Sequence, residues 1–98
     1  MQQTTAIGRL TKEPKLEYTT SGRAKCTFFI AVEEKKGTFK RVDYWPCIAW
    51  RELGELIKNY TEKGKLVAVQ GKWRSYQYQE NGKDRMGYEF EVLECTFY

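Results

Sequence analysis

Histidine is absent from this sequence of 98 residues, and long apolar runs are absent as well. Without histidine, the Ser-His and Cys-His nucleophilic mechanisms and the most common zinc ligand are excluded. The sequence also lacks a Gly-rich phosphate loop and metal-ligand spacing, so we expect a protein that is not an enzyme and needs no cofactor or metal. Because no apolar run approaches the roughly 18 residues of a membrane span, and residues 1–5 lack the pattern of a signal peptide, we expect a soluble, cytoplasmic protein.

Cysteine is scarce, with three residues at Cys26, Cys47 and Cys95. Their number is odd, they lie far apart, and each has apolar or aromatic neighbours, so we expect reduced core residues rather than disulfides or metal ligands. Aromatic residues are abundant by contrast, at 15% of the chain. Because the mean hydropathy is negative, some of these rings must lie near water. The net charge of +4 favours a polyanionic partner, although a mildly basic protein without such a partner is an alternative.

Alternating apolar residues predict strands, and a change of period predicts one helix, in a single domain spanning residues 1–98. The strands are predicted over residues 5–11, 24–33, 39–50, 65–78 and 85–97, with an extended stretch at 15–18 and the helix over 51–60. Gly8 predicts a bulge or bend, and Asn81-Gly82 predicts a turn within a longer loop. This order of elements is that of an OB fold, an all-β, five-stranded Greek-key barrel with a short helix between its third and fourth strands.

The predicted strand over residues 65–78 interleaves cations with rings on one face, which carries Lys72, Arg74, Tyr76 and Tyr78. Burying an unpaired Lys and Arg in a small barrel would cost several kcal/mol each, so this face must meet solvent or a ligand. Rings that stack on unpaired bases and cations that follow phosphates are what binding of single-stranded nucleic acid requires. A solvated face whose rings pack only across strands is the alternative.

The predicted strand over residues 39–50 carries large rings on both faces. Tyr44 and Trp50 share one face and Trp45 lies on the other, so alternation alone does not decide which face points outward. The helix predicted after this strand presents an apolar face made of Leu53, Leu56, Ile57 and Tyr60.

Further charges are candidates for contact with phosphates, with solvated surface charge as an equal alternative. The densest group lies in the predicted hairpin turn and comprises Lys35, Lys36, Lys40 and Arg41. Lys58 and Lys65 are interpreted as partners of the helix dipole, whereas Lys63 is open to either interpretation. In the last strand, Glu89, Glu91 and Glu94 form an acidic stripe that we expect to mark a surface away from the ligand.

These residues together resemble bacterial and phage single-stranded DNA-binding proteins of the SSB type. The resemblance covers nearly the whole sequence and rests on the order and spacing of seven segments: residues 8–14, 18–22, 30–32, 43–50, 53–56, 63–67 and 71–76. It implies an OB fold that binds single-stranded DNA with little sequence preference, in replication, recombination or repair. It also implies a homo-oligomer, either a dimer or a tetramer.

Carried over position by position, the resemblance implies that bases stack on Tyr44, Trp50 and Tyr78, and that Arg74 contacts the DNA backbone. It places Trp45 and Trp73 on faces that pack inward or against neighbouring subunits. Tyr76 stands where the family often has a basic residue. The full set of predicted binding residues is Tyr44, Trp50, Arg74, Tyr76, Tyr78, Lys72, Lys36, Lys40, Lys63 and Phe39.

The sequence departs from the family in three places. Some relatives have a further stacking Trp near the position of Lys36, whereas here the nearest aromatic residue is Phe39. Residues 2–5 are more polar than the family's strand that often helps form the dimer. The sequence ends at Tyr98, before the family's acidic tail would begin. A primosomal accessory protein of the PriB kind, which acts mainly through protein contacts, is the alternative, and it would have fewer outward rings. RNA is an alternative ligand, because stacking does not require a deoxyribose.

Overall fold

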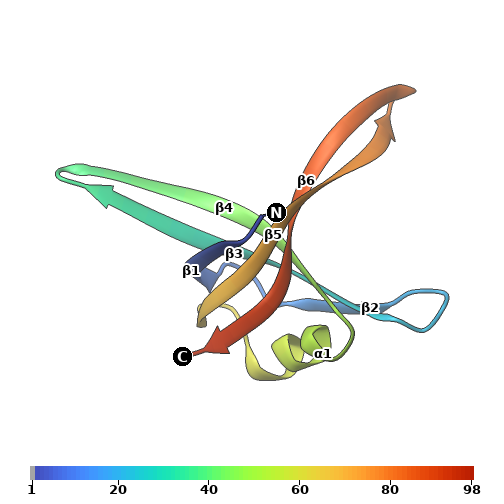
Figure 1. Cartoon of the computed structure of the whole chain (residues 1–98), viewed down its shortest axis with the longest axis horizontal. Helices are drawn as coiled ribbons and strands as arrows, with labels where there is room; N and C mark the ends of the chain where they lie inside the picture. The colour runs from blue at the N-terminus through green and yellow to red at the C-terminus, as the bar shows by residue number, and fades with distance from the viewer. Residues whose placement is uncertain (1) are drawn as a thin grey trace.

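The computed structural model describes residues 2–98, which form six strands and one helix. In chain order these are β1 (Thr4–Leu10), β2 (Lys15–Tyr18), β3 (Ala24–Lys36), β4 (Phe39–Trp50), α1 (Arg51–Tyr60), β5 (Leu66–Glu80) and β6 (Lys83–Phe97). Because β1 pairs with both β5 and β3, five strands close in the order β1-β5-β6-β4-β3, and β2 extends the sheet beside β3. The closed barrel with its helix between β4 and β5 confirms the predicted OB fold (Figure 1).

Strict alternation of side chains along the barrel strands builds the core. In β3, for example, Phe28 and Ile30 are buried while Phe29 between them is exposed, as the two-residue period of a strand dictates. The fully buried side chains of largest volume are Phe90, Leu10, Ile30, Ile57, Val67, Val69 and Cys26. Each such apolar side chain contributes about 1.5–3 kcal/mol of transfer free energy on burial. The barrel is therefore a packed core, and any ligand must bind to its outside.

A bulge or a bend was predicted at Gly8, and the bulge is found in another strand. Within the described residues β1 keeps an unbroken register with β5, whereas the register of β5 against β6 shifts between Gln70 and Gly71. Gly8 lies close to the backbone of β3, and a Cβ there would come within 2.5 Å of the Ala31 carbonyl oxygen. Glycine is thus required at this position by the close approach of two strands rather than by a bulge.

Helix α1 covers one end of the barrel, at the bottom of Figure 1. Its buried residues are Gly54 and Ile57, and a Cβ on Gly54 would lie 2.7 Å from the Ala49 carbonyl oxygen. Leu56 and Tyr60 are 45% and 62% exposed, so the apolar face predicted for this helix is only partly buried. The glycine allows the helix to approach β4 so closely that Gly54 and Ile57, rather than Leu56, face the core. In residues 2–98 this ten-residue helix is the only one, and it is too short and polar to cross a membrane.

Two hairpins extend beyond the barrel wall, β3–β4 to the left of Figure 1 and β5–β6 to its upper right. The prediction of a longer loop around Asn81-Gly82 is wrong, because Glu80 pairs directly with Lys83 and leaves a two-residue turn. Both turn residues have positive φ, 53° and 76°, which is the conformation that Asn-Gly favours in tight hairpins. The tight turns let the paired strands continue as long ribbons.

Candidate nucleic-acid interface

The inner face of the sheet holds three large rings packed against one another. The Trp45, Trp73 and Phe90 ring centroids lie 5.0, 5.1 and 5.3 Å apart in pairs, and the ring planes are strongly tilted. Such edge-to-face contacts add about 0.5–1.5 kcal/mol per pair to the burial of the rings. Trp45 and Trp73 therefore pack inward, as the resemblance implied.

The position of Trp45 decides the question that alternation left open in β4. Because Trp45, Cys47 and Ala49 belong to or pack on the core, Tyr44 and Trp50 point to the outside of the sheet. Tyr44 is 65% exposed. The outer face of β4 therefore presents two of the rings predicted to stack on bases.

Trp50 is half-buried and has cations beside its ring. The Arg23 guanidinium lies 4.4 Å from the ring centroid, and the Lys25 ammonium lies 5.9 Å from it. Lys25 stands directly opposite Trp50 in the register of β3 and β4. Neither cation was predicted as part of the site, although alternation along residues 23, 25 and 27 places both on the outer face. A nucleobase at this position can stack on the indole or on the guanidinium plane.

Two open hollows flank Trp50, with volumes of about 690 and 450 Å³. Both are lined by Arg23, Trp50 and Arg51, and the smaller one extends to Arg74 and Tyr76 on β5. Arg51, the first helical residue, has a φ of 61°, a value that non-glycine residues rarely adopt. The sequence around Arg51 does not predict this conformation, so only the structure shows that Arg51 lines both hollows. The smaller hollow therefore joins Trp50 on β4 to Arg74 on β5.

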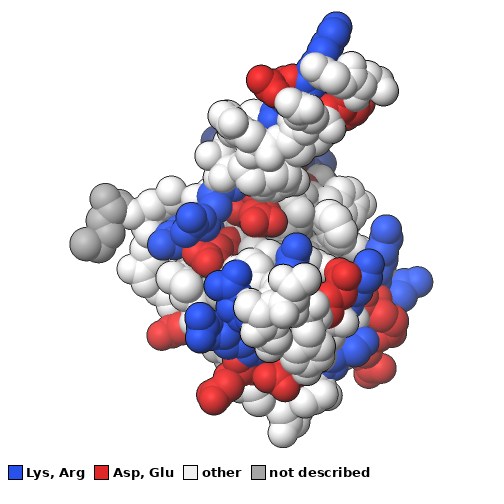
Figure 2. Space-filling model, turned by 90° about the vertical axis from the view of Figure 1, so that its right-hand side faces the viewer, with Lys and Arg blue, Asp and Glu red and all other residues white. Residues whose placement is uncertain are grey.

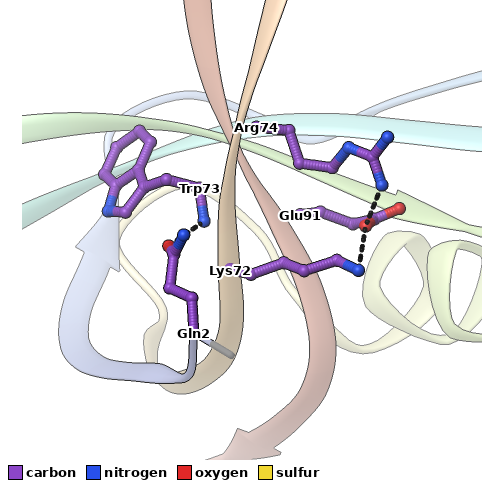
Figure 3. A network of polar contacts seen from close by, with 5 residues as sticks. All are labelled: Gln2, Lys72, Trp73, Arg74 and Glu91. Atoms are coloured by element: carbon purple, nitrogen blue, oxygen red, sulfur yellow. Dashed lines mark hydrogen bonds and ion pairs between the residues drawn. The ribbon is translucent and has the colours of Figure 1, made fainter.

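The outer face of β5 carries two of the predicted cations, and both are engaged by one carboxylate (Figure 3). Glu91 Oε1 lies 3.4 Å from Arg74 Nη1 and 3.9 Å from Lys72 Nζ. The Glu91 side chain is 19% exposed, whereas the two basic side chains are 42% and 55% exposed. In Figure 3 these three side chains lie on the same side of β5, and Trp73 points to the other side.

The acidic stripe, expected to mark a surface away from the ligand, lies in part beside two of the predicted binding cations. In the register of β5 with β6, Lys72 pairs with Glu91 and Arg74 pairs with Glu89, and directly opposite residues share a face. The carboxylates thus stand among the cations that would contact phosphates. On the face of the molecule shown in Figure 2, acidic and basic side chains are likewise interspersed.

Farther along β5, Tyr76 and Tyr78 form a pair of exposed rings. Their centroids are 6.0 Å apart at an interplanar angle of 39°, and the side chains are 46% and 43% exposed. Gly87 stands opposite Tyr76 on β6, and a Cβ there would lie 2.4 Å from Tyr76 Cζ. The tyrosine ring therefore lies over Gly87, whose lack of a side chain leaves room for it.

The β3–β4 hairpin divides its predicted residues between two faces. Alternation from Tyr44 places Lys40 on the outer face, where it lies 3.6 Å from Glu33. Lys36 and Phe39 are paired with each other and lie on the opposite face, although Phe39 is 58% exposed. The structure therefore brings Lys40 toward the rings of β4 and does not bring Lys36 and Phe39 there.

Lys63 lies in the loop between α1 and β5, away from the hollows at Trp50. Its backbone N–H donates to Glu13 Oε1 at 3.2 Å, and it lines a separate hollow that includes Arg9 and Lys65. Lys58 Nζ donates to the Pro14 carbonyl oxygen at 2.8 Å, so it ties the helix to the segment before β2. The structure does not join Lys63 to the other predicted residues.

The three cysteines are unpaired thiols in or beside the core, as predicted. Burial raises the pKa of Cys26 to about 11 and that of Cys95 to about 11, and burial also raises the pKa of Cys47. These thiols therefore stay protonated at neutral pH, the form that is neither a nucleophile nor a metal ligand. Among residues 2–98, no three His, Cys, Asp or Glu side chains gather as a metal site.

Comparison with known proteins gives a consistent match. The model of the single-strand binding protein family matches residues 1–98. The chain is 35% identical over 100 residues to a single-stranded DNA-binding protein of Lactiplantibacillus plantarum, covering 99% of this chain and 50% of that protein. It is 40% identical over 101 residues to single-stranded DNA-binding protein 2 of Clostridium acetobutylicum, covering 99% of this chain and 76% of that protein. A single-stranded DNA-binding protein of Treponema pallidum is 33% identical over 90 residues, with 88% and 51% covered. The chain thus spans about half the length of two of these three relatives.

Proposed function

The chain belongs to the single-strand binding protein family, and on that premise we propose that it binds single-stranded DNA with little sequence specificity. Bases stack on outward aromatic rings, and Lys and Arg side chains contact phosphates. In the cell this binding protects exposed single strands during replication, recombination or repair. Residues 1–98 act as one binding domain.

The observation that supports this proposal most strongly is the shared outer face of β3, β4, β5 and β6. Tyr44 and Trp50 on β4, and Tyr76 and Tyr78 on β5, all point outward. A hollow lined with arginines joins Trp50 to Tyr76. Flat rings tolerate any base because every base has a π-face, which accounts for binding without sequence preference. A module acting mainly through protein contacts has no need of four such rings.

Several finer features are part of the same proposal. Binding is passive, without catalysis or a cofactor, and takes place in the cytoplasm. The protein acts as a homo-oligomer, a dimer or a tetramer. RNA is a secondary ligand, because stacking of bases on rings does not depend on whether the sugar is ribose or deoxyribose.

Titration with oligo-dT tests the proposal. Added oligo-dT should quench the tryptophan fluorescence of the wild type, because Trp50 is the tryptophan on the outer face. Replacing both Trp50 and Tyr78 by Ala should weaken binding at moderate salt by at least about 30-fold, since each stacked base is worth roughly 1–3 kcal/mol. Affinity of the variant is measured by anisotropy of a labelled oligo-dT, because the variant has lost the outward tryptophan that reports binding and keeps only the two inner ones.

A matched control replaces Leu56 and Tyr60 by Ala, two exposed residues on α1, and should leave the affinity unchanged. Failure of the wild type to bind oligo-dT even in dilute buffer contradicts the function. Equal affinity of the Trp50/Tyr78 variant and the wild type contradicts the site.

A further inference from the structure

Phe29 is a large aromatic residue at an outward position of β3, where the core does not need an apolar side chain. Its neighbour Phe28 is 3% exposed in the core, whereas Phe29 is 42% exposed on the outer face of β3. A strand needs an apolar residue only at its inward positions, so an outward phenylalanine does not serve the core. Phe29 was not among the residues predicted to bind.

A cation is held beside this ring by the backbone. Lys12 Nζ lies 5.7 Å from the Phe29 ring centroid. The preceding residue, Thr11, donates its backbone N–H to the Phe29 carbonyl oxygen at 3.0 Å, and its hydroxyl approaches the same oxygen at 3.5 Å. The segment that carries Lys12 is therefore fixed against β3 at Phe29.

The register places Phe29 beside the rings of β4. Phe29 pairs with Pro46 and Ala31 pairs with Tyr44, so Phe29 and Tyr44 are diagonal neighbours on one face. Diagonal neighbours in an antiparallel pair lie about 7–8 Å apart, within reach of aromatic side chains. Along β3, Phe29 is two outward positions from Lys25, which pairs with Trp50. Phe29 thus lies on the same outer face as Tyr44 and Trp50, next to Lys12.

We propose that Phe29 and Lys12 form an additional nucleotide subsite, in which a base stacks on the phenyl ring and its phosphate contacts the lysine. This inference rests on the proposed binding of single-stranded DNA. With this subsite, the path of the bound DNA runs from β4 across β3 toward the protein segment between β1 and β2. The subsite repeats the arrangement at Trp50, where a cation, Arg23, likewise lies beside an outward ring.

Anisotropy of a labelled oligo-dT of about 16 nucleotides tests this subsite, a length that can cover one barrel. Phe29→Leu should weaken binding about five- to thirtyfold, because leucine keeps apolar bulk but offers no ring for stacking. Lys12→Gln should reduce the slope of log affinity against log salt by about 0.7, the contribution of one phosphate contact on a single strand. Tyr60→Leu, an exposed aromatic on α1, is the control and should match the wild type.

A second variant, Phe29→Trp, keeps a ring at the position. It should retain wild-type affinity and show additional fluorescence quenching with oligo-dT. If the wild type binds but Phe29→Leu binds equally well, or if the new tryptophan is not quenched, the subsite is wrong and the proposed function stands. If Phe29→Leu changes only the mass measured by light scattering, the ring is a contact between copies and the subsite is likewise wrong. If the wild type itself does not bind, both proposals fail.

Discussion

The two faces of the barrel sheet both carry large aromatic rings, but the rings have different neighbours. On the inner face, Trp45, Trp73 and Phe90 lie about 5 Å from one another. On the outer face, Trp50 and Phe29 lie 4.4 and 5.7 Å from a guanidinium and an ammonium group. For these five rings, the neighbouring group distinguishes those that build the core from those available to a ligand.

The physical reason is the cost of burying charge. A cation beside an inner ring would lose its hydration without a partner, at a cost of several kcal/mol. Outside, the same cation keeps most of its water, and a cation over a ring adds about 0.5–1 kcal/mol at exposed sites. A phosphate can then replace water at the cation while a base covers the ring.

The largest expected effect comes from breaking the inner face. Phe90→Ala should lower the free energy of unfolding by about 3–5 kcal/mol, because Phe90 is fully buried and contacts both core tryptophans. Urea denaturation measures this change. Tyr44→Ala, an exposed ring on the outer face of β4, is the control and should change stability by no more than about 0.5 kcal/mol. Similar losses in both variants would show that the two faces do not differ as described.

On the outer face, removing one negative charge should strengthen binding. Glu91→Gln should tighten oligo-dT binding about two- to tenfold at low salt, because the carboxylate no longer competes with phosphate for Lys72 and Arg74. The salt dependence should also become steeper, since more phosphate contacts form. Glu94→Gln on the same strand is the control, expected to have a smaller effect. Weaker binding by Glu91→Gln would mean that the carboxylate positions the cations instead of competing with DNA.

The smallest effect is expected from Gly87→Ala. Its Cβ would displace the far end of the Tyr76 ring, so oligo-dT binding should weaken about two- to fivefold while the melting temperature stays nearly unchanged. A double-mutant cycle with Tyr76→Ala isolates the cause. In the Tyr76→Ala background the glycine substitution should have no further effect on affinity. An equal loss in that background would place the effect somewhere other than at the tyrosine.

Much of the fold could be predicted from the sequence, because local patterns carry it. Regular alternation predicted β4 at residues 39–50, and the change of period predicted α1 at residues 51–60, both with the observed bounds. Closure of the barrel followed from the order of the elements. The exact bounds of the hairpins were less predictable, since pairing across β5 and β6 extends both strands to a two-residue turn.

The site was harder to predict because it depends on which strands lie side by side. Alternation could not choose between the two faces of β4 until Trp45 was seen in the core. The opposition of Glu91 to Lys72 depends on the register of β5 with β6, which no local pattern gives. Phe29 was missed for a simpler reason: next to Phe28 it reads as one more apolar residue, although alternation places it outside.

The contrast between the two faces is tested most directly by ¹⁹F NMR of the protein labelled with 5-fluorotryptophan. The chain contains three tryptophans, two packed inward and one on the outer face, so three signals report the two environments. Titration with oligo-dT should shift or broaden the Trp50 signal strongly and leave those of Trp45 and Trp73 nearly unchanged. A Trp50 signal that does not respond while the inner tryptophans shift would contradict the account.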